Sequence, residues 1–118
     1  MGKKILIADD DPTLTCLLGS YLAAEGFDIT VAHDGDEALR KFELERPDLI
    51  ILDVVMPVVN GYAFLFAMRK VEPVVKTPII VLTVKPELAG IFLAEGVQEY
   101  MIKPFQRQDL LSRIRKYI

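Results

Sequence analysis

The run LIILD at residues 49–53 is the clearest indication of the fold class of this chain. A continuous apolar run that ends in a carboxylate is typical of a central strand covered on both faces, as in parallel sheets. Similar short runs occur at residues 4–8, 28–32, 78–83 and 99–102. Helical patterns separate these runs, and strict alternation of strand and helix predicts an α/β fold, with a parallel sheet and helices on both of its faces.

The expected helices are recognised by their boundary residues and by apolar residues spaced three or four positions apart. The first helix begins after Asp11, an N-cap residue, with Pro12 at its first position, and it ends at Gly26. Its predicted apolar face consists of Leu14, Leu17, Leu18, Tyr21 and Leu22. Further helices are expected between the second and third strands, over residues 62–70 and 86–95, and at the C-terminus.

The composition fits one domain over residues 1–118 and excludes several classes of protein. A hydrophobic fraction of 52% is too high for a disordered chain, and the single cysteine, Cys16, excludes a disulfide scaffold and a cysteine-based zinc site. The net charge of −3 gives no electrostatic reason to expect direct nucleic acid binding. No apolar stretch is long enough for a membrane span or a signal peptide, so we expect a cytoplasmic protein.

Polar side chains follow four of the expected strands at the point where each strand ends. They are Asp9, Asp10 and Asp11 after the first strand, Asp53 after the third, Thr83 at the end of the fourth and Lys103 after the fifth. In open α/β sheets the functional site lies at the carboxyl ends of the strands, so these groups form one cluster if the four strands are neighbours. Asp11 stands directly before Pro12, and an N-cap role alone also explains it.

Each group in this cluster has a chemical task that suits it. Neighbouring carboxylates repel one another unless a cation intervenes, and Mg²⁺ suits oxygen ligands at a site that it shares with phosphate. An aspartate can act as a nucleophile and form an aspartyl phosphate. Thr83 could hydrogen-bond a phosphoryl oxygen, and Lys103 could neutralise another as a point charge. The metal ion and the lysine together would offset the charge that develops during phosphoryl transfer.

Four segments of the chain together resemble the receiver domains of response regulators, the phosphoacceptor modules of two-component signalling. They are ILIADDDP at 5–12, LIILDVVMPVVNG at 49–61, IIVLT at 79–83 and YMIKPF at 100–105. The resemblance covers essentially the whole chain, and the order and spacing of the motifs make it specific. It implies a doubly wound, flavodoxin-like parallel sheet of five strands in the order 2-1-3-4-5, with five helices on its two faces.

The resemblance assigns an acceptor residue and a metal site. It implies that Asp53 receives a phosphoryl group from a phosphohistidine of a partner kinase. Asp9 and Asp10 would lie at a Mg²⁺ site, with Asp10 the more direct ligand, and Asp53 and the backbone carbonyl of Val55 would complete the protein ligands. The chain would not be a turnover enzyme, because it would accept the phosphoryl group onto itself.

The resemblance also implies a conformational switch beside the acceptor. Thr83 would move toward the phosphoryl group, and Tyr100 would turn inward behind it. Lys103 would contact the phosphoryl group, and the bond between Lys103 and Pro104 would be cis, which X-Pro chemistry permits at modest cost. Phosphorylation would then bias a pre-existing equilibrium between two states.

The implied partners are proteins that precede and follow this domain in a signalling pathway. A sensor histidine kinase or a histidine phosphotransfer protein would donate the phosphoryl group, and a downstream protein or an output domain would respond to it. The switching surface would comprise the fourth helix, the fifth strand and the fifth helix, with Leu88, Phe92 and Tyr100 as contact residues. A homodimer through this surface is a further expectation.

The sequence departs from the pattern of receiver domains at a few positions. Val84 stands where a small residue usually follows the threonine, and the segment from Thr83 to Gly96 is shorter than usual. Val58 and Val59 add apolar surface beside the acceptor. Extra core packing explains the apolar residues of the third and fourth helices, and a partner or dimer surface explains them equally.

Three other functions compete with a phosphorylation switch. A degenerate receiver would act as a phosphate-independent interaction scaffold. The short fourth-helix segment favours this alternative, whereas the presence of Asp53, Thr83 and Lys103 argues against it. A phosphatase of the haloacid dehalogenase type would need a second acid two positions after the nucleophile, where this chain has Val55. A flavodoxin would need hydroxyl and glycine donors for phosphate after the first strand, where this chain has acids.

Overall fold

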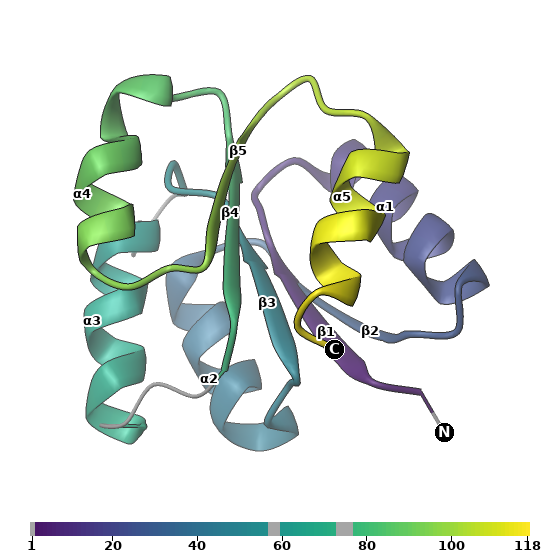
Figure 1. Ribbon diagram of the computed structural model, residues 1–118. Coiled ribbons are helices and arrows are strands. Elements are labelled where there is room, and N and C mark those ends of the chain that lie inside the picture. The colour runs from purple at the N-terminus through teal and green to yellow at the C-terminus, as the bar shows by residue number, and fades with distance from the viewer. Residues whose placement is uncertain (1, 57–59, 73–76) are drawn as a thin grey trace.

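A five-stranded parallel sheet forms the centre of the protein, as a computed structural model of residues 2–56, 60–72 and 77–118 describes it. The strands lie in the order β2-β1-β3-β4-β5, which confirms the predicted topology (Figure 1). Their bounds are Lys4–Ala8 (β1), Asp28–Ala32 (β2), Leu49–Leu52 (β3), Ile79–Thr83 (β4) and Glu99–Ile102 (β5). Val58 and Val59 lie outside the described residues.

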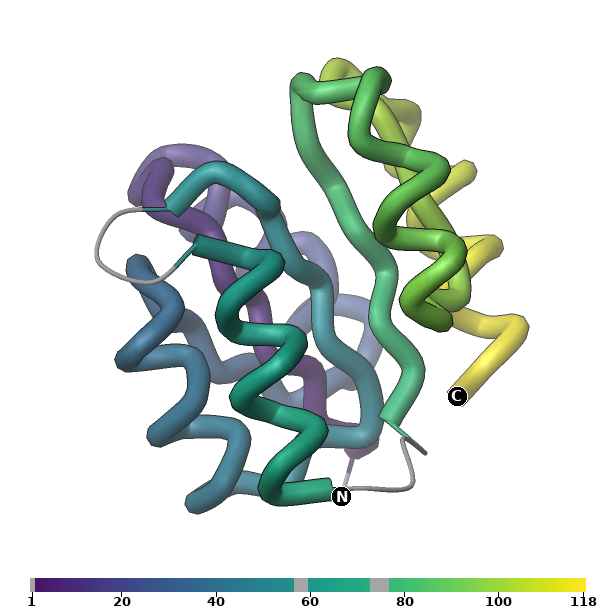
Figure 2. Tube along the Cα trace, turned by 90° about the vertical axis from the view of Figure 1, so that its left-hand side faces the viewer, coloured from purple at the N-terminus to yellow at the C-terminus, as the bar shows by residue number. Residues whose placement is uncertain are grey.

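The helices cover both faces of this sheet. Their bounds are Pro12–Ala24 (α1), Gly35–Glu45 (α2), Gly61–Val71 (α3), Ala89–Ala94 (α4) and Arg107–Arg115 (α5), with a 3₁₀ turn, η1, at Pro86–Leu88. Helices α1 and α5 pack on one face and α2, α3 and α4 on the other (Figure 1). Figure 2 shows the second group side by side in chain order. A division of the helices between the two faces of the sheet is what a doubly wound parallel sheet requires.

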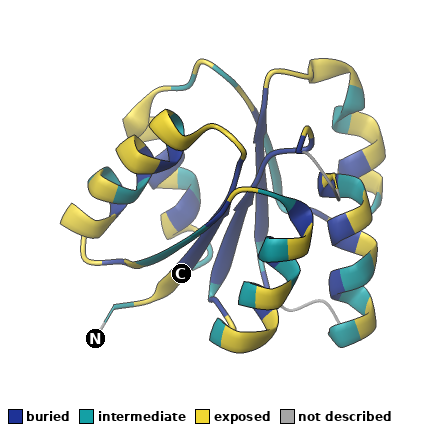
Figure 3. Cartoon of the chain, turned by 180° about the vertical axis from the view of Figure 1, so that it is seen from behind, coloured by how far each residue is buried: buried dark blue, intermediate teal, exposed yellow. Residues whose placement is uncertain are grey.

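Apolar strands separate two hydrophobic cores. All four residues of β3 are buried, and the strand is paired with β1 on one side and β4 on the other. Alternate residues therefore enter opposite cores, with Ile50 packing under α2–α4 and Ile51 packing under α1 and α5. Figure 3 shows the central strands buried and the outer helix surfaces exposed. The apolar run at residues 49–52 is therefore the central strand, as predicted.

Local signals at the ends of α1 act as expected. The Asp11 side chain accepts hydrogen bonds from the backbone N–H groups of Thr13 and Leu14, and Pro12 occupies the first turn. Gly26 follows the helix with a φ of 96°, a conformation that glycine adopts without a steric penalty.

The predicted apolar face of α1 is wrong at one position. Leu17 is 65% exposed, whereas Leu18, Leu22 and Thr15 are buried. Thr15, Leu18 and Leu22 are three and four positions apart and share one side of the helix, while Leu17 is rotated about 100° from Leu18 at the edge of that side. By spacing alone, Leu17 belongs to the same apolar face as Leu18. In the folded protein, only the residues that point at the sheet are buried, and Leu17 stays exposed.

The expected helix over residues 86–95 is divided into two pieces. One 3₁₀ turn, η1, precedes the six-residue helix α4, and no side chain caps the start of either piece. Pro86 begins the turn, and the exposed Gly90 lowers the helix propensity of the segment. Among the described residues, no helix has the length and apolar character needed to cross a membrane.

Candidate functional site

The carboxyl edge of the sheet brings together the residues predicted at the strand ends. The Asp53 N–H donates to the Ala8 carbonyl at 2.9 Å, and the Lys103 N–H donates to the Thr83 carbonyl at 2.8 Å. These bonds continue the hydrogen-bond pattern of the sheet for one residue beyond each strand. The side chains that follow β1, β3, β4 and β5 are therefore held at one edge, as the topology predicted.

Three carboxylates form the acidic part of the site. Asp9, Asp10 and Asp53 each present an oxygen within 4.8 Å of the others, and Asp9 and Asp53 are buried while Asp10 is exposed. Asp9 Oδ1 accepts a 2.9 Å bond from the Asp11 N–H, and Asp53 Oδ1 accepts a 3.2 Å bond from the Val55 N–H. Three hard oxygen donors beside an open edge suit Mg²⁺, so the residues present fit the expected metal ion.

Lys103 supplies a positive charge to this acidic cluster. Its Nζ lies 2.7 Å from Asp9 Oδ2 and 3.2 Å from Asp53 Oδ2. Burial acts to lower the pKa of Lys103, but the hydrogen bond to Asp9 and the charges of Asp53 and Asp9 outweigh it, and the pKa lies above its ordinary value. Burial raises the pKa of Asp9, and the bond from Lys103 offsets only part of that increase.

Thr83 ends β4 with a hydroxyl that is fully buried. Among the described residues, Thr83 Oγ1 has no hydrogen-bond partner. A buried hydroxyl without a partner is costly, and native proteins rarely keep one without a role. Thr83 is thus available to donate to an oxygen that enters the site, which is the task predicted for it.

Tyr100 lies on β5, the strand next to the one that ends in Thr83, and is hydrogen-bonded to the loop that follows β4. Its hydroxyl donates to the carbonyl of Lys85, and its ring centroid lies 6.1 Å from that of Phe92. Burial raises the pKa of Tyr100, and the charges of Glu87 and Asp53 add to the increase. The joint movement expected of Thr83 and Tyr100 stays a prediction.

Two backbone features occur in the loops around Asp53. The Lys103–Pro104 peptide bond is cis, as the resemblance implied. A Cβ added to Gly61 would lie 2.5 Å from the Asp53 carbonyl oxygen and 2.7 Å from Val54 Cα, so only glycine fits where α3 meets the acceptor loop. The Val55 carbonyl as a metal ligand stays a prediction; the contact observed at this residue is the hydrogen bond from its N–H to Asp53.

The expected interaction surface requires a correction. Phe92 is 2% exposed and packs edge-to-face on Tyr62 at 5.5 Å, so it is a core residue and not a contact residue. Leu88 is half-buried against the same core. The large apolar side chains that this part of the molecule does expose are Val84, Ile91, Leu93 and Ile102.

Sequence reasoning missed a second polar cluster, at the end of α5. Arg113 and Lys116 both form ion pairs with Glu99, which also accepts a hydrogen bond from Tyr117. The residues are far apart in sequence, and a carboxylate at the start of a strand carries no signal of its own. The Cys16 thiol is free and exposed.

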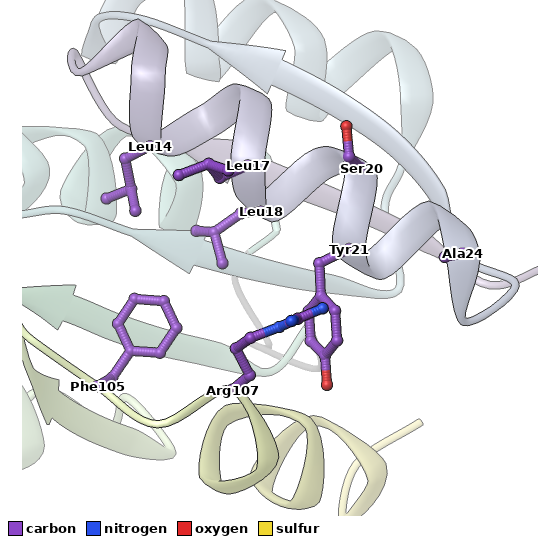
Figure 4. Close-up of a pocket in the computed structure, with 8 residues that line it drawn as sticks. All are labelled: Leu14, Leu17, Leu18, Ser20, Tyr21, Ala24, Phe105 and Arg107. Atoms are coloured by element: carbon purple, nitrogen blue, oxygen red, sulfur yellow. The ribbon is translucent and has the colours of Figure 1, made fainter.

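An apolar groove of about 450 Å³ lies away from the acidic cluster, between α1 and the segment that leads into α5. Leu14, Leu17 and Phe105 line it, and Arg107 stacks on the ring of Tyr21 at 4.0 Å (Figure 4). The groove contains no carboxylate, so its chemistry is separate from that of the strand ends.

Comparisons with known proteins agree with this geometry. The profile of the response regulator receiver domain family matches residues 5–115. The transcriptional regulatory protein CpxR of Escherichia coli is 44% identical over 115 residues, which are 96% of this chain and 48% of CpxR. The chain spans about half the length of the curated relatives that it matches.

Two solved structures are similar over nearly their whole length. Response regulator TrrA of Thermotoga maritima, solved in complex with Mg²⁺ and BeF, is 34% identical with a TM-score of 0.88, covering 98% of this chain and 99% of TrrA. The BeF₃-activated N-terminal receiver domain of Klebsiella pneumoniae RstA is 30% identical with a TM-score of 0.83, covering 97% of each chain. Sequence, fold and site therefore agree that this chain belongs to the family of response regulator receiver domains.

Proposed function

We propose that this receiver domain accepts a phosphoryl group onto Asp53 from a phosphohistidine and thereby switches its own surface. The observation that carries the proposal is the combination at one edge of the sheet of three carboxylates, an ammonium group bonded to two of them, and a buried hydroxyl without a partner among the described residues. These groups correspond to the needs of phosphoryl transfer, which depends on positioning and on neutralising charge.

The transfer would proceed with Asp53 as nucleophile. A carboxylate oxygen of Asp53 attacks phosphorus, and an O–P bond forms as the N–P bond breaks. The electron pair of the N–P bond returns to the ring nitrogen, and a neutral histidine leaves because its other ring nitrogen carries the proton. Mg²⁺, held by Asp9, Asp10 and Asp53, would supply charge neutralisation when it is bound.

The other residues would act on the phosphoryl oxygens. Lys103 already donates to Asp53 and would neutralise one oxygen, as a lysine does at a phosphate. Thr83 would donate its hydroxyl to another. Because Tyr100 lies on the adjacent strand, its inward turn would follow the movement of Thr83 and would break its bond to Lys85.

The proposed partners follow from this chemistry. A histidine kinase or a histidine phosphotransfer protein would supply the phosphoryl group in the cytoplasm, and the chain would not turn over a substrate of its own. A downstream protein or an output domain would respond through α4, β5 and α5, and a homodimer through the same elements would be one form of that response. TrrA and RstA, solved with beryllofluoride, support the proposal by analogy.

The intact mass of the protein after incubation with acetyl phosphate tests the proposal. Wild type should gain one phosphoryl group in Mg²⁺ and none in EDTA, and Asp53→Asn should gain none in either. Asp28→Asn is the matched control, since it removes an exposed carboxylate at the opposite end of a strand and should be phosphorylated like wild type.

Two results would contradict the proposal. A phosphoryl group retained in Asp53→Asn would place the acceptor elsewhere. Wild type that stays unmodified by acetyl phosphate and by a panel of phosphorylated histidine kinases would favour a phosphate-independent scaffold.

A further inference from the structure

The C-terminal end of α5 is bound to the first residue of β5 by charged and polar groups centred on Glu99. The Glu99 carboxylate accepts a 2.5 Å hydrogen bond from the Tyr117 hydroxyl and a 2.9 Å bond from Arg113 Nη1. Lys116 Nζ lies 3.6 Å from the same carboxylate. Helix α5 runs back along β5, so its end returns to the start of that strand (Figure 1).

The bond from Tyr117 to Glu99, here called the α5 tether, is partly shielded from water. The Glu99 side chain is 13% exposed, and Tyr117 packs against the core under α1 and α5. The bond holds the pKa of Glu99 below its ordinary value and raises the pKa of Tyr117. A hydrogen bond to an ionised, shielded acceptor is about twice as strong as a neutral one.

Strand β5 connects the tether to Tyr100. Glu99 and Tyr100 are consecutive residues, so their side chains point to opposite faces of the sheet. Glu99 faces α5, and Tyr100 packs in the core beneath α4, where its hydroxyl donates to the Lys85 carbonyl. On one face of β5, Glu99 therefore accepts a bond from the Tyr117 hydroxyl. On the other face, the next residue, Tyr100, donates its own hydroxyl to Lys85.

Resting on the proposed function, we infer that the α5 tether stabilises the arrangement in which Tyr100 is bonded to Lys85, and that it weakens when Tyr100 turns inward. The end of α5 then reports the state of Asp53. In RstA the receiver domain is the N-terminal part, so the rest of that protein follows its receiver. A tether at this point can pass the switch to whatever segment follows α5.

Thermodynamic linkage makes the inference measurable. If the tether favours one of two arrangements, its removal must favour the other, and a ligand that selects the other must bind more tightly. Beryllofluoride with Mg²⁺, which imitates a phosphoryl group on an aspartate, is the probe. Backbone amide NMR signals report its dissociation constant and the environment of each residue in the same titration.

Tyr117→Phe removes the tether and keeps the ring in the core, so the variant should fold. Glu99→Gln is a second variant, which keeps an acceptor but removes its charge. Tyr21→Phe is the matched control, because it deletes the hydroxyl of a tyrosine in α1, whose ring Arg107 covers, at a site remote from β5.

Tyr117→Phe should bind beryllofluoride at least about fivefold more tightly than wild type, the lower end of the ratios that a coupling of the usual size produces. Glu99→Gln should shift the constant in the same direction, and Tyr21→Phe should leave it unchanged. Without ligand, the amide signals of Lys85 and Tyr100 should move in Tyr117→Phe.

Unchanged affinity in Tyr117→Phe, with shifts confined to Glu99 and residues 113–118, would overturn the inference. Wild type that does not bind beryllofluoride would overturn the proposed function instead. In that case the amide signals of Lys85 and Tyr100, measured without ligand, test the inferred coupling. A change of these signals in Tyr117→Phe would support the coupling, and unchanged signals would reject it.

Discussion

Lys103 Nζ lies 2.7 Å from Asp9 Oδ2, although the two residues are 94 positions apart in the chain. The same ammonium group donates to Asp53, so one lysine after β5 joins the ends of β1 and β3. Without this cation, three carboxylates would face one another at close range. Lys103 therefore carries part of the neutralisation that Mg²⁺ would also supply, and the two cations should be partly interchangeable.

Replacement of Lys103 by methionine tests this relationship. At pH 7 in EDTA, Lys103→Met should lower the free energy of unfolding by about 1–3 kcal/mol, because Asp9 and Asp53 lose a charged donor. Saturating Mg²⁺ should then stabilise the variant more than it stabilises wild type. Urea unfolding with EDTA and with Mg²⁺ measures both effects, and Lys70→Met, at an exposed position of α3, is the control. A smaller Mg²⁺ effect in Lys103→Met would contradict the argument.

Asp10 is the exposed member of the acidic cluster, so its removal should separate metal binding from stability. Asp10→Asn should weaken Mg²⁺ binding by about tenfold or more, a loss that is common even for residues that only support a ligand. In EDTA its free energy of unfolding should equal or exceed that of wild type, because one repelling charge is gone. Isothermal titration with Mg²⁺ and urea unfolding check the two parts. An equal Mg²⁺ affinity in the variant would exclude Asp10 as a ligand.

The α5 tether should give the stability a specific pH dependence. The pKa of Glu99 is lowered in the folded protein, so its contribution is present above the unfolded value of 4.5 and is lost as pH falls through the folded pKa. Tyr117→Phe should cost about 1–2 kcal/mol at pH 7, and its difference from wild type should shrink below pH 4.5. Urea unfolding across the acid range tests this, and a difference that stays constant on acidification would contradict it.

The pKa of Tyr117 makes a second prediction, at alkaline pH. That pKa is raised above 10.0 in the folded protein, chiefly by the bond to Glu99. Its contribution is therefore complete below pH 10.0 and is lost as pH rises through the folded pKa. Absorbance titration should show one tyrosine that ionises later in wild type than in Glu99→Gln. Coinciding titration curves for the two proteins would argue against the bond.

Two glycines should respond to alanine in opposite ways. A Cβ at Gly61 would lie 2.5 Å from the Asp53 carbonyl oxygen, and the three atoms nearest to it are all backbone atoms of Asp53 and Val54. Gly61→Ala should destabilise the protein by about 1–3 kcal/mol or more and slow the phosphorylation of Asp53. Gly90→Ala meets nothing within 4 Å and should stabilise α4 by about 0.5–1 kcal/mol. Urea unfolding of both variants tests the contrast, which equal effects would refute.

Phe92 and Ile91 are neighbours in α4 with opposite environments. Phe92 is 2% exposed and Ile91 is 49% exposed. Phe92→Ala should cost about 3–5 kcal/mol, because it leaves a cavity beside Tyr62 and Tyr100, whereas Ile91→Ala should stay within about 0.5 kcal/mol. If Ile91→Ala nevertheless weakens binding to a partner, Ile91 and not Phe92 belongs to the interaction surface. A mild effect of Phe92→Ala on unfolding would restore the sequence-based interpretation.

Much of the fold followed from patterns that are local in the chain. The five strands, the capping of α1 by Asp11 and the stop at Gly26 were predicted from residues within a few positions of one another. The position of Asp53 also followed, because a carboxylate directly after a buried parallel strand must lie at the carboxyl edge of the sheet. Helix caps and turns depend on short-range sterics, which the sequence displays directly.

Boundaries and burial were less predictable where two local signals competed. The segment from Pro86 to Glu95 has the apolar spacing of a helix, but its proline and Gly90 oppose one, and the structure divides it into η1 and α4. Leu17 has the spacing of the buried face but lies at its edge. At Leu17 the outcome depended on how α1 packs against the sheet, and in the segment from Pro86 to Glu95 it depended on the helix-breaking residues.

A doubly wound parallel sheet, with acids, a hydroxyl and a lysine at the ends of its strands, could be predicted from the sequence of this chain. These features depend on the order of residues along the chain and on the geometry of parallel strands. Three features required the folded structure: Lys103 donates to Asp9 and Asp53, Thr83 Oγ1 is buried, and Glu99 accepts a hydrogen bond from Tyr117. Those contacts join residues from different elements, and their distances depend on how the helices pack on the sheet, which no local pattern specifies.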